Sequence, residues 1–335
     1  MTMTQTSTPP PSTAVRRLNA AQLLSRYGTF AAFLVLILFN LVVTPNFLSW
    51  QTLNVNLTQV ATIVIVATGM TLVIATGGID LSVGSLMAIS GAIAPMIFMG
   101  KVFPVDNMAL AVGLSFVVPV LVVMVFGWFN GFLVTHFSIQ PIIATLVLFI
   151  AGRGIAQVAT NGNLQVFKNG AFQFIAMGRI FGIPAQVVLM IVIAILAHCL
   201  IRYTVLGRQI IAVGGNEKAA RLTGIPVRRV KTFVYIISGA LAAIAGLVVV
   251  ARNSASDANL VGLGMELDAI AAVAVGGSLL TGGRANILGT VLGAFVIQLV
   301  RYTLLANGVP DAAALIVKAG LIIIAVFIQQ RADKV

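Results

Sequence analysis

Ten long apolar stretches constrain this chain most, because each has about the length that a helix needs to cross a bilayer. Spanning the hydrocarbon core takes about 20 apolar residues. The stretches cover residues 28–43, 57–76, 81–100, 109–135, 141–160, 185–203, 232–251, 265–283, 286–305 and 312–330. Only 8% of the residues are charged, whereas a soluble domain carries about 25%. The sequence therefore predicts an all-α polytopic membrane protein of about ten transmembrane helices, with one transmembrane domain over residues 27–335.

The chain begins with a polar segment, residues 1–26, in which Thr, Ser and Pro dominate up to Thr13. Such a segment cannot bury enough apolar area to order itself, so we expect a disordered tail. An even number of spans puts both termini on one side. If that side is the cytoplasm, 13 Lys and Arg residues fall in inner segments, four in outer loops and three within spans, which accounts for all 20. The positive-inside rule thus predicts cytoplasmic termini, and the net charge of +12 reflects topology rather than nucleic-acid binding.

A short polar helix is predicted inside the basic loop at residues 204–231. The glycines at 214–215 are expected to break the structure before it. Asn216 can cap the helix, because its side-chain oxygen can accept the free N–H groups of the first turn. Glu217 and Arg221 follow at a spacing of four residues, which lets them pair and suits the helix dipole. A helix of about two turns is marginal alone in water, so we expect it to dock on a soluble partner.

A glycine pattern occurs twice, at residues 77–84 and 276–283. In register, the glycine pair, a Leu and the last Gly match, and Ser82 aligns with Thr281. Glycine-interrupted spans in two halves of a chain are typical of broken helices near a transport pathway. Close glycine packing between helices is the alternative. The candidate pathway residues in these segments are Gly77, Gly78, Asp80, Ser82, Gly276 and Gly277.

Asp80 needs its own explanation, because a carboxylate between long apolar runs is costly unless it is paired, hydrated or at the surface. The predicted topology puts Asp80 at the cytoplasmic edge. There it could cap the following helix with help from Ser82 or otherwise fix that helix in place, or it could act directly in the pathway. Both interpretations remain open at the level of sequence.

Charged residues also occur toward the outer ends of several predicted spans. Glu266 and Asp268 open one span, and Arg153, Arg301 and Lys318 lie in three others. Structural ion pairs are the favoured interpretation, since isolated charges at this depth are expensive. The alternative is a polar vestibule for a hydroxylated solute, with Asp268 in the pathway. A polar outer loop precedes this span and offers a docking surface to a soluble partner through Arg252, Asn253 and Asp257.

The sequence contains no motif that predicts catalytic activity. A phosphate-binding loop of the Gly-x-x-x-x-Gly-Lys-Ser/Thr type does not occur. His136 and His198 lie far apart without metal-ligand spacing, and the single Cys199 excludes an intramolecular disulfide or a cysteine cluster. We therefore predict that the chain is not an enzyme, holds no metal and binds no cofactor.

Three motifs carry a resemblance to a known family. They are GMTLVI and GGIDLSVGS within residues 69–85, GGNEKAARLTGI at 214–225, and ELDAIAAV with two glycine pairs within 266–283. In this order they resemble the ribose-type sugar permeases of bacterial ABC importers, in the branched-chain amino acid/ribose permease superfamily. The resemblance runs from about residue 30 to 330. Within the family, GRGIAQ at 152–157 and the Asp-Ala-Asn loop at 257–259 are most similar to galactofuranose-type permeases.

The resemblance implies a type II-like permease in the bacterial inner membrane, working in an importer of four parts. These are two permease chains, the same or homologous, a cytoplasmic ATPase that binds the ATP, and a soluble sugar-binding protein outside. Residues 214–224 would be the coupling helix seated on the ATPase. Its contact residues would be Asn216, Glu217, Lys218, Arg221 and Leu222.

A stand-alone secondary transporter driven by an ion gradient is the main alternative. Broken helices and the Asp80 carboxylate would suit it equally well. It gives no reason for an isolated capped helix in a basic loop.

Overall fold

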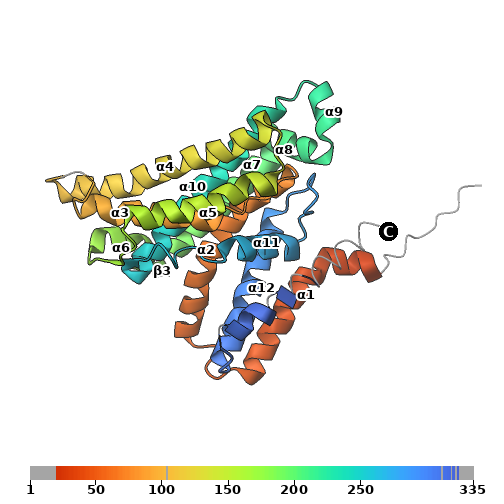
Figure 1. Cartoon of the computed structure of the whole chain (residues 1–335). Coiled ribbons are helices and arrows are strands. Elements are labelled where there is room, and N and C mark those ends of the chain that lie inside the picture. Colours follow the sequence, from red (N-terminus) through yellow and green to blue (C-terminus); the bar gives the residue numbers. More distant parts are fainter. Residues whose placement is uncertain (1–19, 103–104, 311, 318, 321–322, 324–335) are drawn as a thin grey trace, which may run out of the picture.

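The computed structural model describes residues 20–102, 105–310, 312–317, 319–320 and 323, and most of them are helical (Figure 1). The helices are α1 (Ala20–Val43), α2 (Trp50–Ala75), α3 (Val83–Phe98), α4 (Met108–His136), α5 (Pro141–Ala159), α6 (Gly170–Met177), α7 (Ala185–Tyr203), α8 (Val205–Gly215), α9 (Glu217–Leu222), α10 (Val227–Asn253), α11 (Met265–Val275) and α12 (Ile287–Ala306). Two short antiparallel ribbons pair β1 (Gln165–Val166) with β4 (Ala255–Ser256) and β2 (Arg179–Ile180) with β3 (Ile183–Pro184). The predicted helical membrane fold is confirmed at this level.

Among the described residues, six helices are long and apolar enough to cross a membrane: α2, α4, α5, α7, α10 and α12. Helix α3 and the apolar part of α1, Gly28–Val43, are shorter. Most of the predicted tenth span, residues 312–330, and all of the predicted tail up to residue 19 lie outside the described residues. The predicted number of ten spans is therefore not confirmed.

The predicted span at 265–283 is wrong as a continuous helix. Helix α11 has 11 residues and ends at Val275, so at 1.5 Å per residue it covers only about half of the hydrocarbon thickness. The chain then crosses the glycine-rich residues 276–286 before α12 begins. Glycine weakens a helix because it has more backbone freedom to lose than any other residue, and this segment with its four glycines takes the place of the second half of the predicted span.

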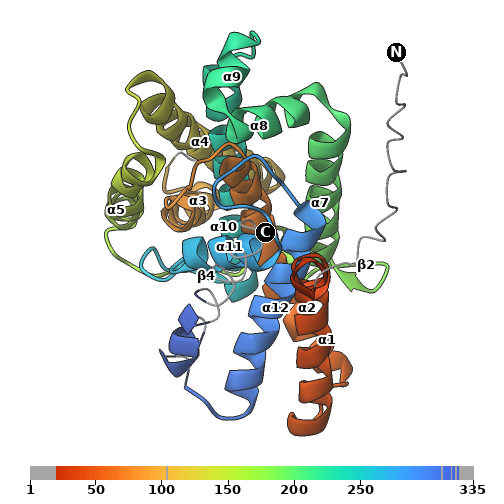
Figure 2. The ribbon, with the colours of Figure 1, turned by 90° about the vertical axis from the view of Figure 1, so that its right-hand side faces the viewer.

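Helices α2 and α10 form the interior of the bundle, with α4 and α5 on one side and α7 on the other (Figure 2). The apolar window of α2 is 83% buried and that of α10 is 61% buried, against 28% for α4 and for α5. Small residues let α10 approach its neighbours closely: a Cβ on Gly246 would lie 2.9 Å from the Cα of Met87 on α3. Such small-residue crossings are the usual way to pack helices in lipid, where apolar burial alone gives no driving force.

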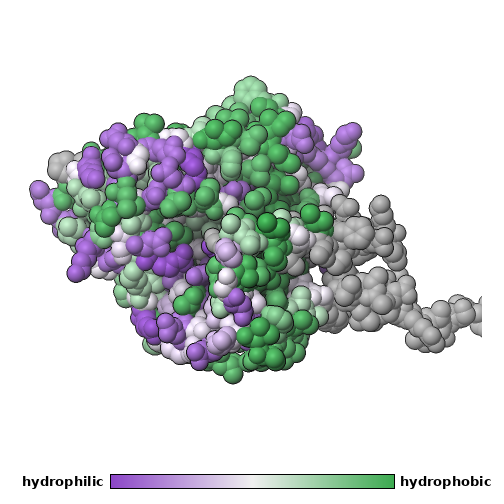
Figure 3. Space-filling view, turned by 60° about the horizontal axis from the view of Figure 1, so that its bottom comes forward, coloured by the Kyte–Doolittle hydropathy of each residue, from purple (hydrophilic) through white to green (hydrophobic). Residues whose placement is uncertain are grey.

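The outward faces of the peripheral helices are apolar, as a lipid-facing surface requires. Val125 on α4, Ile150 on α5 and Leu196 on α7 are exposed. Figure 3 shows large apolar areas on the face it presents, with polar side chains gathered toward the left, where Figure 1 places α6 and the start of α4. We call this the α6 end of the molecule, and the opposite end, which carries α8 and α9, the α9 end.

A cluster of aromatic rings closes the α6 end. Phe98, Phe116 and Phe167 surround Phe172 with ring centroids 5.0 to 5.6 Å away. Phe172 lies on α6, a helix of eight residues that the sequence did not predict because it is too short for a periodic signal. The cluster fixes α6 against α3 and α4, which gives the predicted outer loop at 161–184 a folded structure.

Candidate functional site

The first glycine segment breaks the chain between α2 and α3 at the α9 end. Helix α2 ends at Ala75, and Gly77 takes a left-handed conformation with φ of +80°. Only glycine adopts this conformation without a steric cost. The chain turns through residues 76–82, and α3 starts at Val83. The predicted interruption is thus present as a sharp turn between two helices.

Asp80 lies at the centre of this turn with no exposed surface. Its Oδ1 accepts hydrogen bonds from the backbone N–H of Ser82 at 3.0 Å and from the Ser82 hydroxyl at 2.6 Å. Its Oδ2 accepts one from the hydroxyl of Ser238 on α10 at 2.8 Å. Asn130 on α4 donates to the Ser82 hydroxyl at 2.8 Å. Three donors therefore converge on one buried carboxylate, and Asn130 supports one of them from α4.

These bonds correct the predicted capping role. Ser82 is the N-cap residue of α3, but its side chain makes no hydrogen bond into the first turn. Asp80 binds the N–H of Ser82 itself instead of the free N–H groups beyond it. The carboxylate thus sets the direction in which α3 begins and ties the turn to α10. Sequence could not reveal Asn130 or Ser238 as partners, because they lie 48 and 158 residues away.

Gly78 is required for packing. A Cβ at this position would lie 2.6 Å from the Oη of Tyr235 and 3.2 Å from the Cγ1 of Val73. Tyr235 lies on α10, is 1% exposed, and its hydroxyl has no hydrogen-bond partner within the part of the chain that is described. At this glycine, close packing between helices is the interpretation that the geometry supports.

The second glycine segment separates α11 from α12. Gly277 is left-handed with φ of +78°, whereas Gly276 packs tightly, since a Cβ there would lie 2.5 Å from the backbone of Gly289 on α12. Asn286 closes the loop: its N–H donates to the Ser278 hydroxyl at 3.0 Å, and its Oδ1 accepts from the N–H of Gly289 as the cap of α12. Both segments therefore turn the chain between helices, as the repeat predicts.

The two segments touch each other. The N–H of Gly283 donates to the carbonyl oxygen of Ala75, the last residue of α2, at 3.0 Å. A Cβ on Gly282 would lie 2.8 Å from the backbone nitrogen of Gly77. The repeat is visible in the sequence, but this contact is not, because it joins residues about 200 positions apart.

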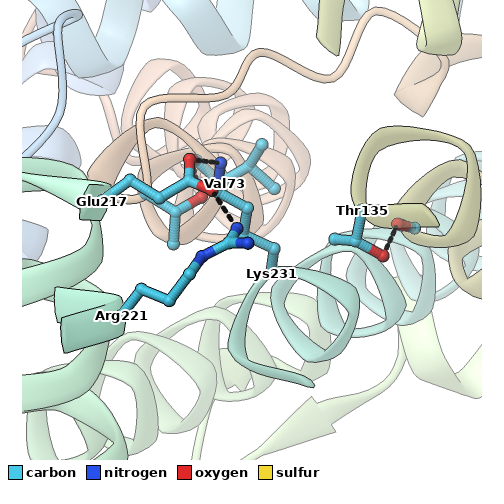
Figure 4. Close-up of polar contacts among 7 residues, drawn as sticks. Val73, Thr135, Glu217, Arg221 and Lys231 are labelled. Atoms are coloured by element: carbon cyan, nitrogen blue, oxygen red, sulfur yellow. Dashed lines mark hydrogen bonds and ion pairs between the residues drawn. The ribbon is translucent and has the colours of Figure 1, made fainter. Parts of the chain in front are cut away.

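The predicted short helix is confirmed as α9, six residues long. Asn216 caps it, accepting the N–H of Ala219 at 3.0 Å, and Arg221 lies 3.2 Å from Glu217. Sequence missed a second partner of Glu217: Lys231 on α10 donates to its Oε2 at 2.5 Å (Figure 4). This bond lies partly out of solvent, since only 16% of the Lys231 side chain is exposed.

One expectation about this loop is wrong. The glycines at 214–215 do not break the preceding structure but form the last residues of α8, which runs from Val205 to Gly215. The helix continues through them because Gly214 packs against backbone, so a larger residue would find no room there. The chain changes direction one residue later, at Asn216, whose backbone is extended.

The side chains that α9 presents to solvent include a large apolar one. Leu222 is 88% exposed, and Lys218, Ala219 and Arg221 beside it are exposed as well. Helix α9 thus presents one large apolar side chain among polar ones on its exposed face. Asn216 and Glu217 bond to other residues of the chain: Asn216 caps α9, and Glu217 binds Arg221 and Lys231.

At the α6 end, the predicted docking residues lie on two different structures. Arg252 donates from Nη1 to the carbonyl oxygen of Thr58 on α2 at 3.0 Å and lines a cavity of about 300 Å³. Asp257 accepts from the N–H and the side chain of Asn259 and so closes its own turn. Asn253 is exposed between them. Among these three residues, only Arg252 lines the cavity.

Among the charges near the outer ends of the predicted spans, Arg153 binds backbone oxygens, and the ion pairs expected for the others stay a prediction. The Nη1 of Arg153 donates to the carbonyl oxygens of Ala258, Asn259 and Val261, at 2.9 to 3.1 Å. This arginine therefore fastens the loop before α11 to α5. Glu266 and Asp268 are buried in the first turn of α11. Asp268 lies one short helix before the second glycine turn, since α11 ends at Val275, and Lys318 lies outside the described residues.

A family model and several known proteins match this chain over most of its length. Residues 52–326 match the family model described as "Branched-chain amino acid transport system / permease component". The galactofuranose transporter permease protein of Escherichia coli is 39% identical over 311 residues, which cover 90% of this chain and 88% of the relative. The ribose import permease protein of Bacillus subtilis is 36% identical over 321 residues, 95% of this chain and 97% of the relative.

The chain belongs to this permease family. A fructose import permease protein of Bifidobacterium longum is also similar, with 39% identity over 84% of this chain and 81% of the relative. These relatives are transport permeases rather than enzymes. No solved structure matches the permease significantly.

The contact between Gly78 and Tyr235 generates the first prediction. Gly78→Ala should destabilise the permease by about 1–3 kcal/mol, because overpacking forces neighbours to shift. Tyr235→Phe removes the atom that the new methyl group meets and should restore most of the loss. Tyr235→Phe alone should be nearly neutral, since the lost hydroxyl has no partner. Thermal unfolding of the purified permease in detergent measures all three variants.

Gly113→Ala is the control, because a Cβ at Gly113 on α4 meets nothing within 4 Å. Equal stability of Gly78→Ala and the wild type would contradict the packing assignment. So would a failure of Tyr235→Phe to rescue.

The anchor of α9 depends on pH. The hydrogen bond from Lys231 holds the pKa of the Glu217 carboxyl below its ordinary value of 4.5. Because the folded-state pKa is lowered, the stabilisation is present above the ordinary value and is lost as pH falls through the folded-state pKa. Glu217 is 42% exposed, so the contribution is expected to stay below about 1 kcal/mol.

Amide hydrogen exchange of the peptide 216–224 measures this effect. At pH 6 the wild type should exchange more slowly than Glu217→Gln, and the difference between the two should shrink as the pH falls and the carboxyl takes up a proton. Lys218→Met serves as the control, since Lys218 is exposed, and it should match the wild type throughout. Identical exchange of wild type and Glu217→Gln at pH 6 would refute the anchor.

Proposed function

We propose that the permease forms the translocation pathway of an ATP-driven sugar importer in the bacterial cytoplasmic membrane. The observation that carries the proposal is α9, a capped helix outside the apolar belt that presents Leu222 to solvent. A permease that works alone has no use for such a helix. A permease driven by a separate ATPase needs a contact of this kind, because the chain itself has no phosphate-binding loop.

The ATPase would bind the ATP and receive α9 in a groove. Leu222 supplies the apolar anchor, and exposed Lys218 and Arg221 surround it with positive charge. Asn216 and Glu217 keep the helix folded before the partner arrives. A pre-folded contact helix saves the ordering entropy that a flexible loop would lose on binding.

The substrate is inferred from the relatives, which are named for ribose, galactofuranose and fructose. We infer a neutral monosaccharide, such as ribose, another pentose or a galactofuranose-like sugar. A soluble sugar-binding protein would dock at the α6 end, through Arg252, Asn253 and Asp257. A second permease chain, the same or homologous, would complete the pathway.

The mechanism would be alternating access, in which ATP binding moves the coupling helices and reorients the spans. Residues of both glycine turns would move with the pathway. Asp80 and Ser82 have no exposed surface in this conformation, so they would contribute by holding α3 to α10. The wider pathway assignment stays a prediction for Gly77, Gly78, Asp80, Ser82, Asp268, Gly276 and Gly277.

An ion-coupled secondary transporter is disfavoured. The matched family consists of permease components of a transport system. The carboxylate that such a mechanism would use, Asp80, already accepts three hydrogen bonds. These bonds leave it no obvious capacity to release and rebind an ion without unfolding the turn.

Reconstitution tests the proposal. The permease, the ATPase and the sugar-binding protein encoded beside it should form one complex, and proteoliposomes should take up labelled ribose or galactofuranose only with ATP. Leu222→Asp should abolish co-purification of the ATPase, because a charge replaces the apolar anchor. Leu260→Asp, a change of the same kind at the α6 end where Leu260 is 64% exposed, should leave it intact. Uptake driven by an ion gradient without ATP would overturn the proposal.

Orientation is tested by labelling cysteines in intact cells. Cys199 is exposed and is first replaced by Ser. A cysteine at Ala219 on α9 should react only after the membrane is opened to the reagent, whereas one at Leu260 should react from outside. Labelling of Ala219→Cys from outside would place the coupling surface on the wrong side for an ATPase.

A further inference from the structure

Three separate backbone segments meet at one point of the α9 end: the end of α2, the second glycine turn and the last turn of α8. We call this contact the glycine junction and define it by Ala75, Gly77, Gly214, Gly282 and Gly283. The Gly283 N–H donates to the Ala75 carbonyl oxygen at 3.0 Å. A Cβ on Gly282 would lie 2.8 Å from the nitrogen of Gly77 and 3.1 Å from the carbonyl oxygen of Gly214.

Gly214 is the residue at which α8 enters the junction. A Cβ there would overlap the carbonyl oxygen of Ala75 and would lie 2.5 Å from the nitrogen of Gly283. Gly214 is helical, so its φ is one that any residue can adopt. Glycine is needed there only because a side chain would have no room. The neighbouring Gly215 is also helical, yet a Cβ on it would meet nothing within 4 Å.

The junction lies directly before the coupling helix. Asn216, the cap of α9, follows Gly214 by two residues, and its N–H donates to the carbonyl oxygen of Ala212 in α8. The contacts at the junction join backbone to backbone, with no flexible side chain between the segments. Close-packed contacts of this kind transmit displacement because they cannot be compressed. A displacement of α9 therefore reaches the end of α2 and the second glycine turn together.

We propose that the glycine junction is a rigid joint that passes movement of α9 to both glycine turns at once, with Gly214 as its positioning residue. The inference rests on the proposed function, since it names the route from the ATPase contact into the membrane. It also gives the glycine repeat a mechanical role: α8 rests on Ala75 and on Gly283 of the second copy, and Gly282 of that copy in turn contacts Gly77 of the first. Gly214 touches no substrate and acts only through the segments that it positions.

Two matched variants test the role of Gly214. Gly214→Ala should force α8 away from the joint and lower the sugar imported per ATP hydrolysed about tenfold, within the usual range of coupling between sites. Gly215→Ala should keep the wild-type ratio. The ratio is measured in proteoliposomes that hold the complete importer, after co-purification of the ATPase with each variant.

The ratio separates positioning from plain structural damage. If Gly214→Ala lowered uptake and hydrolysis in parallel, with the ratio unchanged, the positioning role would be refuted. Equal ratios for Gly214→Ala and Gly215→Ala would refute it as well. Failure of the wild-type permease to bind the ATPase would instead overturn the proposed function, so the two failures are distinguishable.

A second measurement does not depend on the folding of a Gly214 variant. Spin labels are placed at two exposed positions across the joint, Ala212→Cys on α8 and Thr281→Cys in the second glycine turn, in a chain with Cys199→Ser. A rigid joint predicts the same distance between these labels with and without ATP in the complete importer. The distance from Ala212 to a label at Leu260→Cys should change. A change across the joint, or no change in the second pair, would overturn the proposal.

Discussion

The buried carboxylate of Asp80 is the interaction on which the α9 end depends. A carboxylate without partners is among the most costly groups to place away from water. Here three donors offset that cost, and they come from the turn itself and from Ser238 on α10. The same α10 carries Lys231, which holds α9 through Glu217. One central helix thus fixes both the first glycine turn and α9, so their relative position is set by a single rigid element.

The glycines of the repeat do not share one physical reason. Gly77 and Gly277 have left-handed backbones that other residues adopt only at a cost. Gly78 and Gly276 instead lie where a Cβ would meet Tyr235 or Gly289. Close packing and broken helices, which sequence presented as alternatives, therefore occur together in adjacent residues. The turn needs one glycine for its conformation, and the next glycine lets a neighbouring helix approach.

The two ends of the permease are built by different means. The α6 end is held by packed aromatic rings and by arginines that bind backbone carbonyls. The α9 end is held by glycine contacts and by hydrogen bonds to carboxylates. Between them, α2 and α10 are buried along much of their length. This arrangement suits a membrane component that meets one soluble partner at each end.

The sequence by itself determined the class of this protein and the local features of its loops. Apolar length predicted the helices, a cap and a four-residue charge spacing predicted α9, and three ordered motifs predicted the family, because each of these signals lies within a short window. The tertiary structure decided the contacts between residues that lie too far apart in the sequence for any short window to hold both. It gave Asp80 its partner on α10, and it placed the helical Gly214 against the end of α2. These outcomes depend on atoms that are brought together from more than 100 residues apart, and a contact of that kind leaves no periodicity or spacing in the chain.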